Sequence, residues 1–397
     1  MEEGILVNFF NQSLAKAASL PHIETGQEID LKVDLILGHD GTWPKVLNAW
    51  KNTNYKLAAG NKVFLTLDHG FPALSIKDRI FHQELSQLAK EKNLKLYKHG
   101  EGVLHQVLAE EEALTPGMLI VGADGHVATA GAFGAIAFSL SPEQLIKPLE
   151  TGYYTVTVPE TVTITLENQP IPNVMARDIA LTILGNFHKE IKGKAVALTG
   201  SYLEQASIDS KMTLCNLLPE GGALTAFVIP TTESTEEEAS YTIDVSTLEP
   251  MVAVPPTPTN VQAVSELLGK KITVAIIGGC SAGRMEDMLL CASVLKDKKV
   301  HSDVTLIITP ASSKVANKMD GMGITSVLRN SGAVVMPPGC GPCPGKHFGL
   351  LSPQDIAITT TIRNSPGRIG SEEAEIFLAS PLTVALSALK GEISASE

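Results

Sequence analysis

Short runs of aliphatic and β-branched residues alternate with helical patterns along most of this chain. That alternation constrains the fold more than any other feature, because it is typical of α/β proteins built on parallel sheets. The runs predict strands over residues 34–38, 62–67, 94–98, 118–122, 271–277, 304–309, 333–336 and 355–360, and a strand-rich segment over residues 153–166. Helical spacing between them predicts helices over residues 44–52, 76–92, 142–149 and 176–186.

Two changes of pattern divide the chain. A strand-rich segment with alternating threonines begins near Tyr153, and a proline-rich stretch, P-M-V-A-V-P-P-T-P-T, covers residues 250–259. A chain of 397 residues is long enough for two or three domains. We therefore predict three α/β domains, over residues 1–152, 153–250 and 251–397.

Charge and hydropathy exclude several classes of protein. The net charge is −12 and no stretch is rich in Lys and Arg, so neither a nucleic-acid nor a membrane partner is expected. Apolar runs stay well short of the roughly 20 residues of a membrane span. The N-terminus lacks the features of a signal peptide, and five cysteines in a chain of this length do not suggest a disulfide framework. These features predict a cytoplasmic protein with reduced thiols.

Three of the cysteines lie on Gly/Pro-rich turns that follow predicted strands. Cys280 lies in G-G-C-S-A-G-R, and Cys340 and Cys343 form the pair in P-G-C-G-P-C-P-G. Thiolates on such turns are suited to a soft metal centre. A structural zinc or a fully ligated iron–sulfur cluster takes four protein ligands, whereas three leave a metal position open for substrate. The pattern predicts metal-centred chemistry, and a structural zinc with a histidine as fourth ligand is the alternative.

Titratable residues also gather where predicted strands end. Ligands of parallel α/β sheets bind at the carboxyl ends of the strands. In the first predicted domain these ends carry His39 and Asp40, Asp68 and His69, and Asp124 and His126. In the third they carry the three cysteines and Arg363. Two such edges facing each other would form an active-site cleft.

At this point the chain resembles the aconitase superfamily, in particular the large subunits of 3-isopropylmalate dehydratase and homoaconitase. The order and strand-end placement of the motifs carry the resemblance, which runs over essentially the whole chain. The matching segments are D-L-I-L-G-H-D-G-T-W-P, L-D-H-G-F-P, G-E-G-V-L-H-Q-V-L, P-G-M-L-I-V-G-A-D-G-H, K-M-T-L-C-N, G-G-C-S-A-G-R-M-E-D, P-G-C-G-P-C and I-R-N-S-P-G-R-I-G.

The resemblance implies three α/β domains of the aconitase large-subunit type, without the swivel domain. It implies a [4Fe–4S] cluster held by Cys280, Cys340 and Cys343, with one iron open to substrate. Each remaining site residue takes its expected role from the matched motif: Asp68 and His69 as the acid pair, His105, Asp124 and His126 around the reacting oxygen, Arg363 and Arg368 on substrate carboxylates, and His39 and Asp40 in the pocket lining.

Several positions depart from the family motifs. A serine near substrate is replaced by Gly125, and two asparagines near the cluster are replaced by Ala282 and Ile362. A glutamate expected to partner the second histidine is replaced by Ala197, so His105 is predicted to lack that charge. Pro219 is predicted to interrupt a helix.

The resemblance implies a hydro-lyase that dehydrates and rehydrates a hydroxy di- or tricarboxylate such as isopropylmalate or homocitrate. The family's catalytic base lies on the swivel domain, so a small partner subunit is expected. The alternative is a non-catalytic cluster-binding protein that acts as a sensor or scaffold. The changes at Gly125 and Ala197 are its main support.

Overall fold

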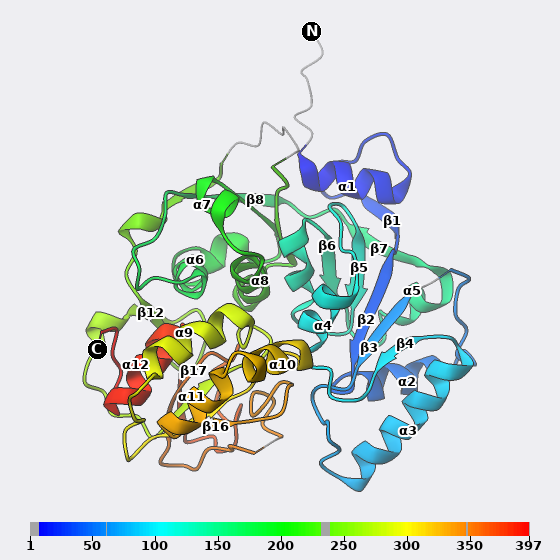
Figure 1. Cartoon of the computed structure of the whole chain (residues 1–397). Coiled ribbons are helices and arrows are strands. Elements are labelled where there is room, and N and C mark those ends of the chain that lie inside the picture. The colour runs from blue at the N-terminus through cyan, green and yellow to red at the C-terminus, as the bar shows by residue number, and fades with distance from the viewer. Residues whose placement is uncertain (1–7, 61, 232–238, 347, 397) are drawn as a thin grey trace.

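A computed structural model of the chain describes residues 8–60, 62–231, 239–346 and 348–396. Three sheets, each covered by helices, make up most of the described structure (Figure 1). Figure 1 shows the first sheet in blue and cyan, the second in green, and the third surrounded by yellow, orange and red elements. The predicted α/β fold class is confirmed.

The first sheet has five parallel strands in the order β4-β3-β2-β5-β6. Apart from the edge strand β4, its strands are largely buried apolar runs, as expected for a parallel sheet covered on both faces. The predicted strands are present within one or two residues at each end, and β6 was missed. The strands are β2 (Leu35–His39), β3 (Val63–Thr66), β4 (Lys95–Tyr97), β5 (Leu119–Gly122) and β6 (Ile136–Ser139). The helices are α2 (Trp43–Lys51), α3 (Ile76–Glu91), α4 (Leu104–Glu111) and α5 (Ile146–Thr151).

The segment over residues 153–166 is strand-rich as predicted, but it does not form one element. It is two strands in different sheets, β7 (Tyr153–Thr157) and β8 (Thr161–Glu167). β7 pairs antiparallel with β1 (Glu28–Lys32), which follows helix α1 (Phe9–Ala18). Alternating threonines suit either pairing, so the sequence pattern did not reveal the break. The domain boundary placed near residue 153 stays a prediction.

The second sheet is parallel, in the order β10-β9-β8-β11. Pro219 ends a helix as predicted, because α8 stops at Leu217 and the short 3₁₀ helix η2 takes over. Another 3₁₀ helix, η1 (Val127–Phe133), follows β5 and packs against α8. The remaining elements are β9 (Ala195–Thr199), β10 (Thr225–Val228), β11 (Tyr241–Asp244), α6 (Ala176–Ile191), α7 (Ser201–Gln205), α8 (Ile208–Leu217) and η2 (Leu218–Gly221).

The third sheet has seven strands in the order β13-β12-β18-β17-β14-β15-β16. Its central strands are parallel, whereas β12 pairs antiparallel with both neighbours. The sequence analysis found four of these strands and missed the other three. The strands are β12 (Met251–Ala253), β13 (Val261–Ala263), β14 (Val274–Ile277), β15 (Thr305–Ile308), β16 (Val334–Val335), β17 (Ile356–Thr359) and β18 (Glu375–Ala379). The helices are α9 (Met285–Leu295), α10 (Ser313–Gly321), α11 (Ile324–Ser331) and α12 (Pro381–Lys390).

The strand orders identify where ligands bind in these sheets. In the first sheet, successive strands are added on one side of β2 and then, from β5, on its other side; in the third sheet the same change occurs between β14 and β17. Both pairs are parallel. Such changes of side leave a crevice beyond the carboxyl ends of the two strands. The predicted site residues come after these four strands and after β3, β4 and β16.

Hydrogen bonds join the segment that begins α4, beside the first sheet, to the segment that begins α10, beside the third. Val103 N–H donates to Ala311 O at 2.8 Å, and Ser313 N–H donates to Glu101 O at 2.8 Å. The Ser312 hydroxyl, which caps α10, also donates to Glu110 Oε1 of α4 at 2.6 Å. Figure 1 accordingly shows α4 and α10 side by side at the centre of the molecule.

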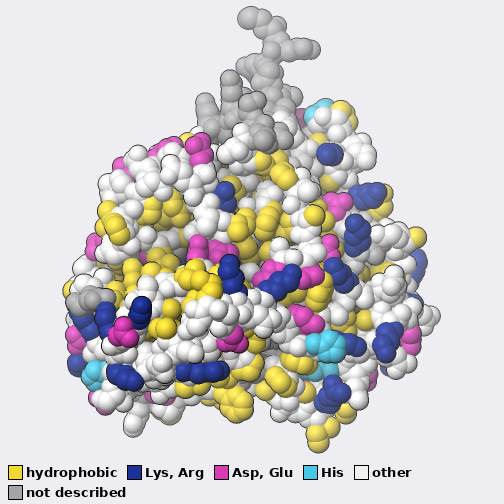
Figure 2. Space-filling view, viewed as in Figure 1, with side chains coloured by type: hydrophobic (Ala, Val, Ile, Leu, Met, Phe, Trp, Pro, Cys, Tyr) yellow, Lys and Arg dark blue, Asp and Glu magenta, His cyan; other side chains and the backbone are white. Residues whose placement is uncertain are grey.

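The surface agrees with the absence of a basic stripe in the sequence. On the face shown in Figure 2, Lys and Arg side chains are interspersed with Asp and Glu rather than gathered in one patch. Among the described residues, no helix is both long and apolar enough to cross a membrane.

Candidate active site

Asp68 and His69 follow β3 and form a close pair. His69 Nδ1 lies 2.6 Å from Asp68 Oδ1, and Asp68 Oδ2 accepts the Leu104 N–H at 2.7 Å in the first turn of α4. Burial disfavours the imidazolium, but the charge and hydrogen bond of Asp68 outweigh it and raise the pKa of His69. Nε2 of His69 has no hydrogen-bond partner among the described residues, so it is the atom that can transfer a proton.

Asp40 holds the backbone of the loop that carries this pair. Its Oδ1 accepts the N–H groups of Asp68 and His69 at 3.0 and 2.8 Å, and its Oδ2 accepts the Gly70 N–H at 2.7 Å. His82 Nε2 lies 3.3 Å from the same Oδ2. Burial opposes the charge, yet these bonds hold the pKa of Asp40 well below its usual range. The carboxylate therefore faces the loop, which fits a positioning role rather than the pocket lining expected from the sequence.

His39 connects this pair to a second cluster. Its ring stacks on His69 with centroids 3.9 Å apart. Nδ1 of His39 accepts the Gly41 N–H at 3.0 Å, so Nε2 carries the ring proton, and it lies 2.7 Å from Asp124 Oδ2. Asp124 Oδ1 in turn accepts the His126 N–H at 2.6 Å and lies 3.0 Å from His105 Nε2. The structure thus brings all seven predicted histidine and aspartate residues of the first domain together.

His105 does have a carboxylate partner. The sequence predicts the loss of a glutamate charge at Ala197; Asp124 supplies a different carboxylate, 3.0 Å from His105 Nε2, while the buried Nδ1 of His105 has no hydrogen-bond partner among the described residues. Ala197 is fully buried in β9 and packs in the core around the first sheet. Burial raises the pKa of Asp124, but the charges and hydrogen bonds of His105 and His39 outweigh this and hold it well below its usual range.

Glu220, from η2 of the second sheet region, completes the polar network. Its Oε1 lies 2.7 Å from His126 Nε2, and Arg363 Nε and Nη2 each lie 2.9 Å from the same oxygen. Burial opposes ionisation, but His126 and Arg363 lower the pKa of Glu220. Sequence analysis did not assign this residue. Its place one position after the helix-breaking Pro219 was the available signal.

The three predicted ligand cysteines border the same polar network. Cys340 N–H donates to Asp68 O at 3.4 Å, and Cys280 Sγ lies 3.8 Å from Asn216 Oδ1 of α8. Burial raises the pKa of Cys280, but the charge and hydrogen bond of His126 outweigh it and bring the value to about 6. Burial and the charges of Asp68, Cys343 and Cys280 raise the pKa of Cys340. A Cβ built on Gly279, next to Cys280, would lie 3.9 Å from Cys343 Cβ, so the two cysteine turns lie side by side.

The side chains that could bind a metal indicate which kind of metal centre fits the site. Closely spaced ligand atoms among the described residues occur in two groups, His39-Asp40-Asp68-His69 and His105-Asp124-His126. Neither group contains a cysteine, although sulfur ligands of one zinc ion lie about 3.8 Å apart given Zn–S bonds of about 2.3 Å. The three cysteines Cys280, Cys340 and Cys343 are free thiols and do not form such a closely spaced group among the described residues, which does not favour a single zinc ion held by all three. The histidines and aspartates of the two groups already bond one another or the backbone.

The two predicted carboxylate-binding arginines differ in their surroundings. Arg363 uses Nε and Nη2 on Glu220, and its Nη1 has no partner among the described residues. Arg368 Nη2 lies 3.6 Å from Cys343 Sγ, so it borders the cysteines directly. A Cβ at Gly125 would lie 3.2 Å from Arg363 Nη2, which places this departure from the family at the pocket wall. Ala282 and Ile362 are both buried, each 1% exposed.

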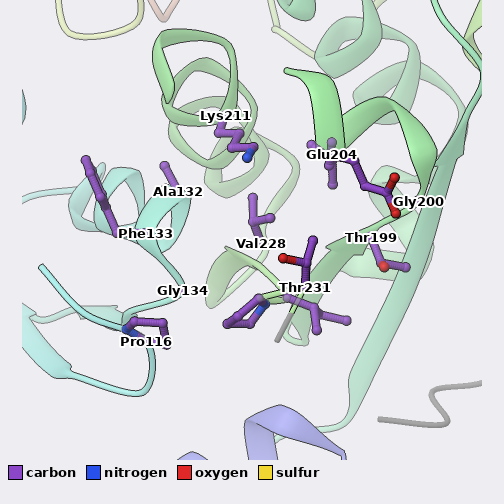
Figure 3. Close-up of a pocket in the computed structure, with 13 residues that line it drawn as sticks. Pro116, Ala132, Phe133, Gly134, Thr199, Gly200, Glu204, Lys211, Val228 and Thr231 are labelled. Atoms are coloured by element: carbon purple, nitrogen blue, oxygen red, sulfur yellow. The ribbon is translucent and has the colours of Figure 1, made fainter. Parts of the chain in front are cut away.

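Figure 3 shows a separate cavity of about 480 Å³. Phe133, Gly134 and Pro116 lie on one side of it, and Thr199 and Gly200 lie on the other. It opens beyond the carboxyl ends of β9 and β10. None of its lining residues belongs to the network described above, so we do not assign the chemistry to this cavity.

Comparison with known proteins agrees with this geometry. A sequence model of the Aconitase family (aconitate hydratase) matches residues 12–237 and 265–391. The chain belongs to the aconitase family. The polar network, the cysteine turns and Arg363 all lie within the matched ranges.

Relatives within the aconitase family match almost the whole chain. A probable methanogen homoaconitase large subunit of Methanothermobacter thermautotrophicus is 34% identical, over 99% of this chain and 98% of its own. A 3-isopropylmalate dehydratase large subunit of Thermococcus kodakarensis is 36% identical, over 94% and 97%. Among solved structures, holo aconitase X of Thermococcus kodakaraensis aligns with a TM-score of 0.52 at 12% identity, covering 89% of each chain. That likeness supports the fold alone.

Proposed function

We propose that this chain is the large subunit of an iron–sulfur hydro-lyase. Its substrate would be a hydroxy di- or tricarboxylate such as isopropylmalate, homocitrate or homoisocitrate, from which it removes and to which it returns water. One observation carries the proposal: a hydrogen-bonded His69–Asp68 acid pair and an arginine lie in one polar network beside three free cysteines. The names of the relatives agree with this class of reaction.

His69 is suited to protonate a departing hydroxyl. Its raised pKa favours the protonated ring, and Asp68 fixes the ring through Nδ1, which leaves Nε2 for transfer. Asp40 holds the loop backbone on which both side chains stand. His105 and His126, both bonded to carboxylates, line the space beside Cys280 and can donate hydrogen bonds to the departing oxygen.

Arg363 is suited to bind a substrate carboxylate. Its side chain is 42% exposed, and Glu220 holds one edge of the guanidinium while Nη1 remains available. A planar guanidinium fixed in this way offers an oriented donor to a carboxylate. Because Gly125 has no side chain against Nη2, the pocket is wider here than a serine would leave it.

Cys280, Cys340 and Cys343 would hold a [4Fe–4S] cluster. When bound, such a group supplies a Lewis-acidic iron that makes hydroxide a better leaving group. Three cysteine ligands leave one position for substrate.

A small subunit would complete the site. Apolar side chains are exposed on the two segments that leave the site loops: Ile76 is 82% exposed after the His69 loop, and Phe348 is 81% exposed after the Cys343 loop. Leu74 and Ile80 near Ile76 in the sequence, and Leu350 near Phe348, are exposed as well, and apolar side chains that gather in this way mark interaction surfaces. We propose that the small subunit covers them and provides the base that removes the carbon-bound proton. Ile76→Glu with Phe348→Glu should abolish co-purification with that subunit, whereas the matched control Leu268→Glu, at a residue 57% exposed, should not.

Anaerobic reconstitution tests the proposal. The chain is loaded with iron and sulfide, combined with a candidate small subunit, and screened against 2-hydroxy diacids by the absorbance of the unsaturated product. Turnover on one of them is expected. A loaded cluster without turnover on any substrate would overturn the enzyme reading, and a colourless protein with one zinc would overturn the cluster.

The sensor or scaffold alternative rests on the changes at Ala197 and Gly125. The carboxylate of Asp124 beside His105 weakens the first of these two arguments. The hydrogen bond between His69 and Asp68 supports catalysis, as do the contacts of Arg363 with Glu220. We therefore favour the catalytic proposal.

A further inference from the structure

Arg177 crosses from the second sheet region into the cysteine turns. It stands at the start of α6 and is 1% exposed. Its Nη1 donates to Ser281 Oγ at 3.0 Å and to Thr360 O at 2.6 Å, and its Nη2 donates to Thr361 O. Ser281 follows Cys280, and Thr361 lies two positions before Arg363. One guanidinium therefore ties the turn that carries a cysteine to the loop that carries the carboxylate-binding arginine.

All the hydrogen-bond partners of Arg177 that the structure describes are neutral. They are one hydroxyl and two carbonyls, and the buried Nε has no hydrogen-bond partner among the described atoms. The adjacent Asp178 directs its carboxylate to the N–H groups of Met175 and Met251, at 2.8 and 2.9 Å. A buried charge without a bonded counter-ion costs several kcal/mol. The position therefore needs a nearby anion to be stable.

Two of the cysteines are among the groups whose negative charge offsets the buried charge of Arg177. Burial lowers the pKa of Arg177 to about 10, and the charges that oppose this are those of Asp178, Cys280, Asp287 and Cys343. A second buried arginine, Arg284, donates from Nη2 to Cys280 O at 2.8 Å. Two buried guanidinium groups thus stand behind the Cys280 turn. Their positive charge matches the negative charge of thiolate ligands.

We propose that Arg177 is a positioning and counter-charge residue for the cluster, which holds the Cys280 turn and the Arg363 loop in register and offsets the thiolate charge. The inference rests on the proposed function. A fixed positive charge near a cluster favours its reduced form, so Arg177 should raise the reduction potential. An arginine that only joined two loops would stabilise the protein without moving that potential.

Three variants separate charge from geometry. Arg177→Lys keeps the charge but loses the planar fork, Arg177→Gln loses the charge, and Arg329→Met removes an exposed arginine in α11 as the matched control. Each full chain is reconstituted anaerobically. Iron and sulfide are counted, and the cluster potential is measured by redox titration with electron paramagnetic resonance. Urea unfolding of the cluster-free chains measures the structural contribution separately.

The expected result is that Arg177→Gln loses most of its cluster, or holds one whose reduced-to-oxidised ratio at a set potential falls tenfold, a shift of about 59 mV for one electron. Arg177→Lys should keep the wild-type potential with reduced loading, and the control should match wild type. If the Gln and Lys variants lose the cluster to the same extent, or if both bind it with the wild-type potential, the counter-charge role is overturned. If wild type itself takes no cluster, the proposed function fails together with the inference. If wild type loads and both Arg177 variants match it, only the inference fails.

Discussion

Replacing Asp68 by Asn should reveal how far the acid pair depends on a buried charge. The change keeps the side-chain volume and one oxygen for the Leu104 N–H, but removes the negative charge 2.6 Å from His69 Nδ1. Because the Asp68 side chain is fully buried, water does not screen that contact. A hydrogen bond to a charged group is worth about 1.5–3 kcal/mol. A loss of about 2 kcal/mol from the transition state corresponds to a roughly 30-fold lower kcat.

The pH dependence gives a second, independent readout. His69 must be protonated to act as an acid, so activity should fall as pH rises through its raised pKa. In the Asn variant the pKa of His69 falls, so the loss of activity should begin at lower pH. Stability follows the same sign: a raised folded pKa adds stability that is complete below about pH 6.5 and is lost as pH rises through the folded value. The free energy of unfolding should therefore differ from wild type more at pH 6 than at pH 9.

The assay is steady-state kinetics of the reconstituted complex from pH 6 to 9, with unfolding in urea alongside. His69→Gln should lower kcat by about 10²–10⁴-fold, the usual contribution of a general acid. His22→Gln, at an exposed histidine, serves as the control and should behave as wild type. An Asp68→Asn variant with the wild-type pH profile, or with a loss below about threefold, would refute the reasoning.

Three further variants test other parts of the site. Glu220→Gln should lower kcat/KM by about 10²-fold, through both a higher KM and a lower kcat, because it removes the carboxylate that holds Arg363 and His126. Unchanged kinetics would contradict this. Gly125→Ser should raise KM about tenfold with kcat changed less than twofold, because its Cβ would lie 3.2 Å from Arg363 Nη2; a wild-type KM would show that substrate does not use this wall. Asp40→Asn should cost about 2–4 kcal/mol of unfolding free energy at pH 7, since three backbone N–H groups depend on it. Because the pKa of Asp40 is depressed, that difference should shrink as pH falls below about 4; a pH-independent difference would contradict it.

Strand positions were predictable because the parallel strands are buried on both faces. Continuous apolar runs such as those of β2, β3 and β5 are characteristic of that environment. β6 and β18 were missed because each is a short apolar run, which its pattern alone does not distinguish from a buried helix segment. The sheet to which β7 belongs could not be predicted, because its pairing with β1 depends on packing between distant segments rather than on its own residues.

The sequence predicted which residues lie in the site better than it predicted what each of them bonds there. Asp40 and Asp68 both follow strands and look equivalent in sequence, yet Asp40 holds three backbone N–H groups of the His69 loop whereas Asp68 pairs with the His69 ring itself. The altered motif at Ala197 indicated a lost glutamate, whereas the carboxylate beside His105 Nε2 comes from the loop after β5. Hydrogen-bond partners depend on side-chain direction, which the order of residues does not specify.

The sequence by itself determined the α/β class, the strand-end histidines, aspartates and cysteines, and the family. These follow from local patterns, because the carboxyl ends of parallel strands meet at one edge whatever the details of packing. Only the tertiary structure decided that Glu220 joins His126 to Arg363, and that Arg177 reaches the Cys280 turn. Both contacts join segments more than 90 residues apart, so they exist only once three separately formed sheets have packed together.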